Sequence, residues 1–256
     1  MEELQNNHPW YSEEAGLFSE AYLKIFQGKL KAKSTEIESD FVQKTLGLEV
    51  DSKILDLACG HGRITIELAK RGFNMTGLDL TKYFLNIAQT DAEIEGLNIS
   101  WVNSDMRKIP FENEFDAVIN MFSAFGYLEN DEEDEKVIKE VYKSLKPKGK
   151  FLIETNNSLR IIKNYSFESK QDIEGGYVVT KRTFDYLRNR HREDYKIYMN
   201  DELFREYSIE FRFYMITELK SMLERNGFNV IKVYGNFDFQ ELTFDSPRNI
   251  ILAEKV

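Results

Sequence analysis

The chain has 256 residues, of which 42% are hydrophobic and 30% charged, and its formal net charge is −10. This length accommodates one α/β domain with an insertion, and the composition is that of a globular protein. The acidic balance argues against a broad nucleic-acid or anionic-membrane surface, because phosphate-rich partners repel an acidic protein. Small-molecule substrates remain compatible with it.

The single cysteine, Cys59, excludes an internal disulfide and fits a reducing compartment. The sequence contains no C-x-x-C motif or histidine cluster, so no metal is expected. The first seven residues are acidic and polar, unlike a signal peptide, and no run of 18 apolar residues could span a membrane. We therefore expect a cytoplasmic protein.

The N-terminal region carries aromatic residues at helical intervals over residues 8–28, followed by an amphipathic pattern over residues 34–46. This predicts two helices within residues 1–46. The pair could pack on the edge of a sheet or act as a lid over a bound ligand, and both interpretations stay open.

A strand, a glycine-rich loop and a helix follow over residues 53–72. Gly60 and Gly62 permit a sharp turn that lets a ligand lie against the backbone, at the N-terminus of the next helix. A dinucleotide fingerprint would have a glycine where Thr65 stands, and Asp56 would repel a pyrophosphate. A cationic ligand with an ammonium and a sulfonium suits this loop better.

Two further strands are followed by or end in acidic residues. The strand 74–79 ends at Asp79, where a carboxylate can take both hydroxyls of a ribose, although an ordinary helix cap is the simpler alternative. After a helix over 81–95 and a strand over 99–102 come Asp105 and Met106.

The second half of the chain completes the expected sheet. An apolar run over 115–122 predicts a buried parallel strand, and the acids of 129–135 precede a helix over 137–145, where they suit the helix dipole better than a metal. A strand over 150–154 follows. Between residues 165 and 214, β-rich runs over 177–186, 195–199 and 203–214 predict an antiparallel meander. A helix over 217–226 and strands over 229–234 and 249–254 follow, and we expect the last strand to enter as an antiparallel hairpin partner.

These elements predict an α/β fold: a Rossmann-like, mostly parallel seven-stranded sheet with helices on both faces, an N-terminal helical lid and an inserted antiparallel β meander. We assign residues 1–46 to the lid, residues 47–164 and 215–256 to the core, and residues 165–214 to the insertion. The insertion could cap the substrate or form a homodimer interface.

The loop, which reads Asp56-Leu-Ala58-Cys-Gly60-His-Gly62, resembles the nucleotide-binding motif of class I S-adenosylmethionine-dependent methyltransferases. The resemblance implies S-adenosylmethionine as cofactor and S-adenosylhomocysteine as product. It places Asp79 on the ribose and Asp105 on the adenine, with Met106 packing on the ring. The full set of expected cofactor-binding residues is Asp56, Ala58, Gly60, Gly62, Arg63, Asp79, Leu80, Asp105, Met106, Asn120 and Tyr22.

More narrowly, the chain is similar to N-methyltransferases that act on nucleotide-linked amino sugars. The similar stretches are Tyr11-Ser-Glu, Ala21-Tyr22, Gln27-Gly28-Lys29, Ser104-Asp105-Met106-Arg107, residues 121–128 and Phe211-Arg-Phe-Tyr214. That group tends to have glycine at position 104, histidine at position 127 and paired tryptophans at positions 156 and 157. These departures leave methyl transfer intact and put the sugar-nucleotide substrate in question.

The resemblance implies in-line transfer of a methyl group to a small-molecule acceptor, most simply an amine. We expect Tyr11 and Tyr127 to be the catalytic tyrosines that orient the acceptor, and Asn156, Asn157 and Arg212 to contact the substrate. Two alternatives stay open: a non-catalytic S-adenosylmethionine-binding or regulatory protein, and a methyltransferase of protein or RNA. No nucleic-acid or membrane partner is expected.

Overall fold

The computed structural model describes residues 9–12, 17–26 and 30–256. Its centre is a seven-stranded sheet with the order β10-β11-β5-β4-β1-β2-β3. The strands of this sheet are β1 (Lys53–Leu57), β2 (Asn74–Asp79), β3 (Ser100–Asn103), β4 (Phe115–Asn120), β5 (Leu145–Asn156), β10 (Phe228–Tyr234) and β11 (Arg248–Lys255).

The strands β1 to β5 pair in parallel with one another, whereas β11 runs antiparallel to both β5 and β10. The predicted Rossmann-like, mostly parallel sheet is therefore confirmed, including the reversed final strand. β4 lies between β5 and β1, and helices cover both faces of the sheet. Its sequence is therefore apolar and largely buried.

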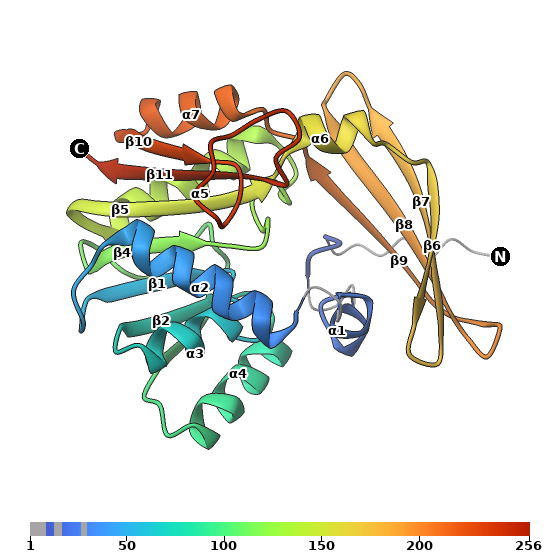
Figure 1. Cartoon of the computed structure of the whole chain (residues 1–256), viewed down its shortest axis with the longest axis horizontal. Helices are drawn as coiled ribbons and strands as arrows, with labels where there is room; N and C mark the ends of the chain where they lie inside the picture. Colours follow the sequence, from blue (N-terminus) through green and yellow to red (C-terminus); the bar gives the residue numbers. More distant parts are fainter. Residues whose placement is uncertain (1–8, 13–16, 27–29) are drawn as a thin grey trace.

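Helices cover both faces of this sheet (Figure 1). Successive strand residues point to opposite faces, so Ile54 packs beneath α2 and α3, whereas Leu55 packs beneath α5 and α7. The helices are α1 (Glu20–Phe26), α2 (Ala32–Leu46), α3 (Arg63–Lys70), α4 (Lys82–Ile94), α5 (Asp131–Ser144), α6 (Ser158–Lys163) and α7 (Ile216–Arg225).

Local sequence explains where several helices begin and end. α2 ends at Gly47, which adopts φ 56° and whose N–H bonds to the carbonyl of Gln43. The acidic run that could be mistaken for a metal site forms the first turn of α5, where the side chain of Asn130 accepts from the N–H of Glu133. Among the described residues, no group of three or more His, Cys, Asp or Glu could hold a metal ion.

The inserted region forms a second, four-stranded antiparallel sheet in the order β6-β7-β8-β9. Its strands are β6 (Glu168–Ile173), β7 (Gly176–Asp185), β8 (Arg190–Met199) and β9 (Glu202–Arg212). The sequence predicted the last three but not β6, which reads ESKQDI and lacks a run of β-branched or aromatic residues. Pairing with β7 supplies its hydrogen bonds instead.

α1 lies between the two sheets (Figure 1). Ile25 of α1 and Leu17 before it pack on the inner face of the second sheet with Val178 and Ile197, and Tyr22 contacts Phe84 of α4. The helix expected over residues 8–28 lies partly outside the described residues, which form a helix over Glu20–Phe26. Movement of this region as a lid stays a prediction.

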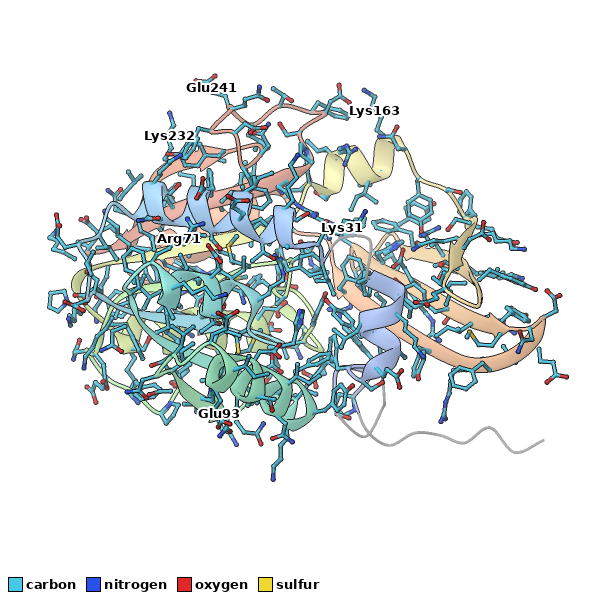
Figure 2. All side chains as sticks on the ribbon, turned by 60° about the horizontal axis from the view of Figure 1, so that its bottom comes forward. Lys31, Arg71, Glu93, Lys163, Lys232 and Glu241 are labelled. Atoms are coloured by element: carbon cyan, nitrogen blue, oxygen red, sulfur yellow. The ribbon has the colours of Figure 1, made fainter. Side chains whose placement is uncertain are left out.

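Ion pairs connect α2 and α3 on the surface of the protein. Arg71, labelled in Figure 2, follows α3 and contacts Asp40 of α2 at 2.6 Å and Glu67 of α3 at 2.9 Å. These pairs fix α2 against α3 and therefore the helix that begins at the glycine-rich loop. Within the described ranges, no helix is long and apolar enough to cross a membrane.

Candidate functional site

A cavity of about 910 Å³, part of it open to solvent, lies at the carboxyl ends of β1, β2, β3 and β4. α3 and α5, which follow the adjacent strands β1 and β4, cover opposite faces of the sheet. The chain therefore diverges between these two strands, which is where open α/β sheets bind ligands. Tyr11, Phe18, Tyr22 and Leu30 close the cavity from the N-terminal side.

The glycine-rich loop forms the floor of the cavity. Gly60 lines it with φ 57°, and a Cβ at this position would meet no atom within 4 Å, so the bare backbone faces open space. Gly62 has φ 76° and is tightly enclosed, because a Cβ there would lie 2.7 Å from the Trp101 ring. Ala58 also adopts a left-handed conformation, with φ 57°, which is strained for a residue with a side chain.

Asp79, at the end of β2, organises the loop from the neighbouring strand. Its carboxylate is buried and accepts the N–H of Gly60 at 2.8 Å and the N–H of Thr81 at 2.8 Å. Leu80 lines the cavity beside it. The acid predicted to bind a ribose is thus at the cavity wall.

Asp105 and Met106 line the cavity after β3. Arg107 binds the Asp105 carboxylate with two nitrogens, at 3.0 and 2.6 Å. Burial alone would raise the pKa of Asp105, but the hydrogen bonds from Arg107 hold it below its usual value. Asp105 therefore remains a carboxylate, and its position is fixed.

Three residues predicted at the cofactor site are outside the set that lines the cavity: Gly62, in the loop itself, and Asp56 and Asn120, which lie beneath it. Asp56 is buried and accepts the hydroxyl of Thr65 at 2.6 Å. Burial raises its pKa to about 7, although the Thr65 hydrogen bond opposes the rise. Asn120 is also buried and donates to the carbonyl of Leu57 at 2.8 Å. Both hold the floor of the cavity together.

Arg63 faces the cavity from the first turn of α3. Its guanidinium forms an ion pair with Glu38 of α2 at 2.5 Å and lies 5.2 Å from the centre of the Phe122 ring. The sequence predicted Arg63 as a cofactor-binding residue. The structure pairs it with Glu38 and leaves the residue at the cavity wall.

Tyr22 and Tyr127 form an aromatic wall with Phe18 and Phe84. The ring centres of Tyr22 lie 5.3 Å from Phe18 and 5.6 Å from Phe84, and Tyr127 stacks on Phe18 at 6.5 Å. Burial raises the pKa of both tyrosines well above the usual value. Both hydroxyls therefore stay protonated at neutral pH and can donate or accept hydrogen bonds. Sequence patterns did not identify Phe18 or Phe84, because aromatic residues in helical segments usually indicate core packing.

Tyr11 also lines the cavity, but its hydroxyl donates to Glu129, beside the Asp105–Arg107 pair. Burial and this hydrogen bond raise its pKa. The Trp10 ring lies between Tyr11 and Tyr127, with its ring centre 5.8 Å from that of Tyr11 and 4.8 Å from that of Tyr127. The structure thus places the Tyr11 hydroxyl toward the Asp105 end of the cavity. Glu129 was missed because the acidic run around it predicted only a helix start.

The three residues expected to contact the substrate are not among those that line this cavity. Asn157 caps α6 and donates to the carbonyl of Ser246 at 2.9 Å. Arg212 pairs with Asp131 and Glu218 at 3.1 and 2.6 Å. The side chain of Asn156 accepts from Arg248. Arg212 joins β9 to the core, whereas Asn156 and Asn157 contact β11 and the loop before it.

Comparison with known proteins agrees with this arrangement. A family described as "Methyltransferase domain" matches residues 54–149, which include the glycine-rich loop and the two acids. The putative methyltransferase YqeM of Bacillus subtilis is 30% identical over 209 residues, which cover 79% of this chain and 84% of that protein. The chain belongs to the S-adenosylmethionine-dependent methyltransferases.

Three other similarities extend over most of this methyltransferase. A demethylmenaquinone methyltransferase of Lactobacillus johnsonii is 32% identical over 197 residues, covering 73% of this chain and 72% of that one. A methyltransferase structure from Clostridium acetobutylicum superposes with TM-score 0.79 at 20% identity, covering 94% and 98% of the two chains. The amino pentose methyltransferase CalS10 of Micromonospora echinaspora gives 0.69 at 22% identity, covering 92% and 97%. At these identities, the structures support the fold alone.

Proposed function

We propose that this methyltransferase transfers the methyl group of S-adenosylmethionine to an amine of a small-molecule acceptor. When bound, the cofactor supplies an electrophilic methyl group on a sulfonium. The protein residues then bind the two partners, align them and exclude water. The observation that carries the proposal is the cavity that is lined by both the glycine-rich loop and the tyrosines Tyr22 and Tyr127.

The residues at the cavity fit this cofactor. The open backbone at Gly60 leaves room for a ligand against the loop, and the acids Asp79 and Asp105 suit ribose hydroxyls and an adenine amine, which are hydrogen-bond donors. Met106 and Leu80 supply apolar contacts for the adenosine. We assign Arg63 and Tyr22 to the methionine end, with Ala58 and Gly62 shaping the loop, and Asp56 and Asn120 supporting it from below.

An amine acceptor suits the chemistry of the wall. A neutral amine attacks through its own lone pair, so it needs orientation and loss of one proton rather than a strong base. Tyr127 provides a protonated hydroxyl that can accept from or donate to such an amine. Its raised pKa disfavours proton abstraction by the phenolate, so Tyr127 orients the acceptor. Tyr11 supports the adenosine end through Glu129.

A small acceptor fits the enclosure better than a macromolecule. Tyr11, Phe18, Tyr22 and Leu30 lie over the cavity, and a protein or RNA chain would have to displace this segment to reach the loop. The net charge of −10 disfavours RNA. The named acceptors of the related proteins, demethylmenaquinone and an amino pentose, are also small molecules.

We also propose the functional division of the chain into a lid over residues 1–46, a cofactor-binding core over 47–164 and 215–256, and a cap over 165–214. It is supported by the strand composition of the two sheets and by α1, whose Ile25 packs on the second sheet. The cap role is favoured because Phe211 of β9 contacts Tyr127, with ring centres 6.1 Å apart.

Methyl-labelled S-adenosylmethionine tests the acceptor class. The protein is incubated with the labelled cofactor and a cell extract, which is then separated by size into metabolites, protein and nucleic acid. The proposal expects label in the metabolite fraction, in an amount that depends on the added protein. Label confined to protein or nucleic acid would replace the proposal with a macromolecular acceptor.

A further inference from the structure

The turn after β4 has an unusual backbone. Phe122 and Ser123 are consecutive non-glycine residues in the left-handed region, with φ 60° and 58°. Side chains disfavour this conformation, and turns with two such residues usually use asparagine and glycine. Met121, Phe122 and Ala124 line the cavity, so this strained turn forms part of its wall.

Glu154 of the adjacent strand β5 binds the turn at its strained position. One carboxylate oxygen accepts the backbone N–H of Ser123 at 3.2 Å, and the other accepts the Ser123 hydroxyl at 3.2 Å. Glu154 is 1% exposed, and Arg248 of β11 compensates its charge at 3.1 Å. A carboxylate that accepts both donors of one residue restrains that residue strongly.

The conformation of the turn decides where the Phe122 ring lies. That ring is 6.4 Å from the ring of Phe26 in α1 and 5.2 Å from the guanidinium of Arg63 in α3. The Phe122 ring therefore lies between α1 and the first turn of α3, the helix that follows the glycine-rich loop. A relaxed turn would move this ring and open the wall between them.

We propose that Glu154 is a positioning residue that holds Phe122 and Ser123 in the left-handed conformation and thereby shapes the end of the cavity that receives the methionine part of the cofactor. This inference rests on the proposed function, because it depends on which end of the cofactor lies beside Arg63. Glu154 acts through the turn and need not touch the ligand.

Calorimetry with two ligands separates this role from a general structural one. S-adenosylhomocysteine fills both ends of the site, whereas adenosine lacks the methionine part. Glu154→Gln retains one acceptor oxygen but presents an NH₂ group to a donor of Ser123. We expect about tenfold weaker binding of S-adenosylhomocysteine, as relief of a strained turn of this kind implies, and less than about threefold change for adenosine.

The decisive variant is the double change Ser123→Gly with Glu154→Gln. Glycine adopts the left-handed conformation without a side-chain penalty, so it should restore S-adenosylhomocysteine affinity to within about threefold of the wild type. Glu140→Gln is the matched control, since that carboxylate accepts the N–H of Ile109 at 3.0 Å, and neither residue lines the cavity. It should leave both affinities unchanged.

If Glu154→Gln does not fold, Ser123→Val carries the test, because a β-branched residue disfavours the left-handed conformation while Glu154 stays intact. It should also weaken S-adenosylhomocysteine selectively. Equal losses for both ligands, or no rescue by glycine, would overturn the positioning role. Failure of the wild-type protein to bind either ligand would instead contradict the proposed function.

Discussion

The carboxylate of Asp79 accepts the backbone N–H of Gly60 at 2.8 Å, so the last residue of β2 holds the loop that follows β1. One acid therefore serves two purposes: it fixes the glycine-rich loop and it presents a carboxylate to the cavity. The sequence predicted Asp79 as a ribose ligand, with an ordinary helix cap as the alternative, but not its hydrogen bond to the loop. Its substitution should thus affect both the loop and the bound cofactor.

Asp79→Ala should weaken S-adenosylmethionine binding by roughly 1.5–3 kcal/mol, because it removes charge-assisted hydrogen bonds to the ligand and to the loop. Calorimetry measures the change. Asp116→Ala is the control, since Asp116 accepts the backbone N–H of Lys53 and pairs with the Lys146 side chain near the amino end of β4. Unchanged affinity in Asp79→Ala would remove Asp79 from the cofactor site.

Alanine at the two loop glycines should have different consequences. Gly62→Ala places a methyl group 2.7 Å from Trp101, so it should destabilise the fold by about 1–3 kcal/mol. Gly60→Ala has open space around it, so its fold should lose only about 1 kcal/mol for the left-handed backbone while cofactor binding weakens. Urea unfolding and calorimetry distinguish the two. The reverse pattern would contradict the assignment of Gly60 to the ligand.

Phenylalanine substitutions should separate the two predicted catalytic tyrosines. Tyr127→Phe keeps the ring and deletes the hydroxyl that orients the acceptor, so kcat should fall by on the order of tenfold with cofactor affinity nearly unchanged. Tyr11→Phe deletes the hydrogen bond to Glu129, so it should cost about 0.5–1.5 kcal/mol in stability or cofactor affinity. Steady-state kinetics with the identified acceptor measure both. Full activity of Tyr127→Phe would assign that tyrosine to packing.

Asp134, which does not line the cavity, should make the free energy of unfolding depend on pH. It is fully buried, accepts the Tyr214 hydroxyl at 2.9 Å, and has a pKa raised to about 7, chiefly by burial. Below about pH 4 both the folded and the unfolded states hold its proton. As the pH rises toward about 7 only the folded state keeps it, so this group makes folding less favourable.

Asp134→Asn should therefore gain stability relative to the wild type as the pH rises from about 5 to about 7, by up to about 1.4 kcal/mol per pH unit. Urea unfolding at several pH values measures the difference. Asp116→Asn is a control for which the stability difference should change with pH in the opposite direction. Burial raises the pKa of Asp116, but the interactions with Lys146 and Lys53 together outweigh it and lower the pKa below its usual value. A pH-independent difference for Asp134→Asn would show that the raised pKa is wrong.

Periodicity and turn residues predicted the parallel strands, the loop and the two acids, because each depends on a short segment whose pattern is local. β6 was missed because its polar sequence becomes a strand only by pairing with β7. Asp56 and Asn120 were expected at the ligand, but their partners, Thr65 and Leu57, come from elements that meet only in the folded chain. The hydrogen bond between Glu154 and Ser123 also joins residues 31 positions apart, so the sequence pattern does not predict it.

The substrate residues were the least predictable part. Asn157 donates to the carbonyl of Ser246, and Arg212 pairs with Asp131 and Glu218, away from the residues that line the cavity. A sequence pattern gives the position of a residue along a strand but not which neighbouring loop satisfies its side chain. The aromatic wall of Phe18, Tyr22, Phe84 and Tyr127 likewise depends on three separate segments.

The central claim is methyl transfer to an amine of a small molecule in the cavity beside Tyr127. The most direct measurement is the chemical identity of the labelled product, formed from methyl-labelled S-adenosylmethionine and a metabolite extract and determined by NMR of the transferred methyl group. The account predicts an N-methyl signal that appears with the wild-type protein and falls strongly with Asp79→Ala. A methyl group on oxygen or carbon, or a labelled product that forms equally well with Asp79→Ala, would contradict it.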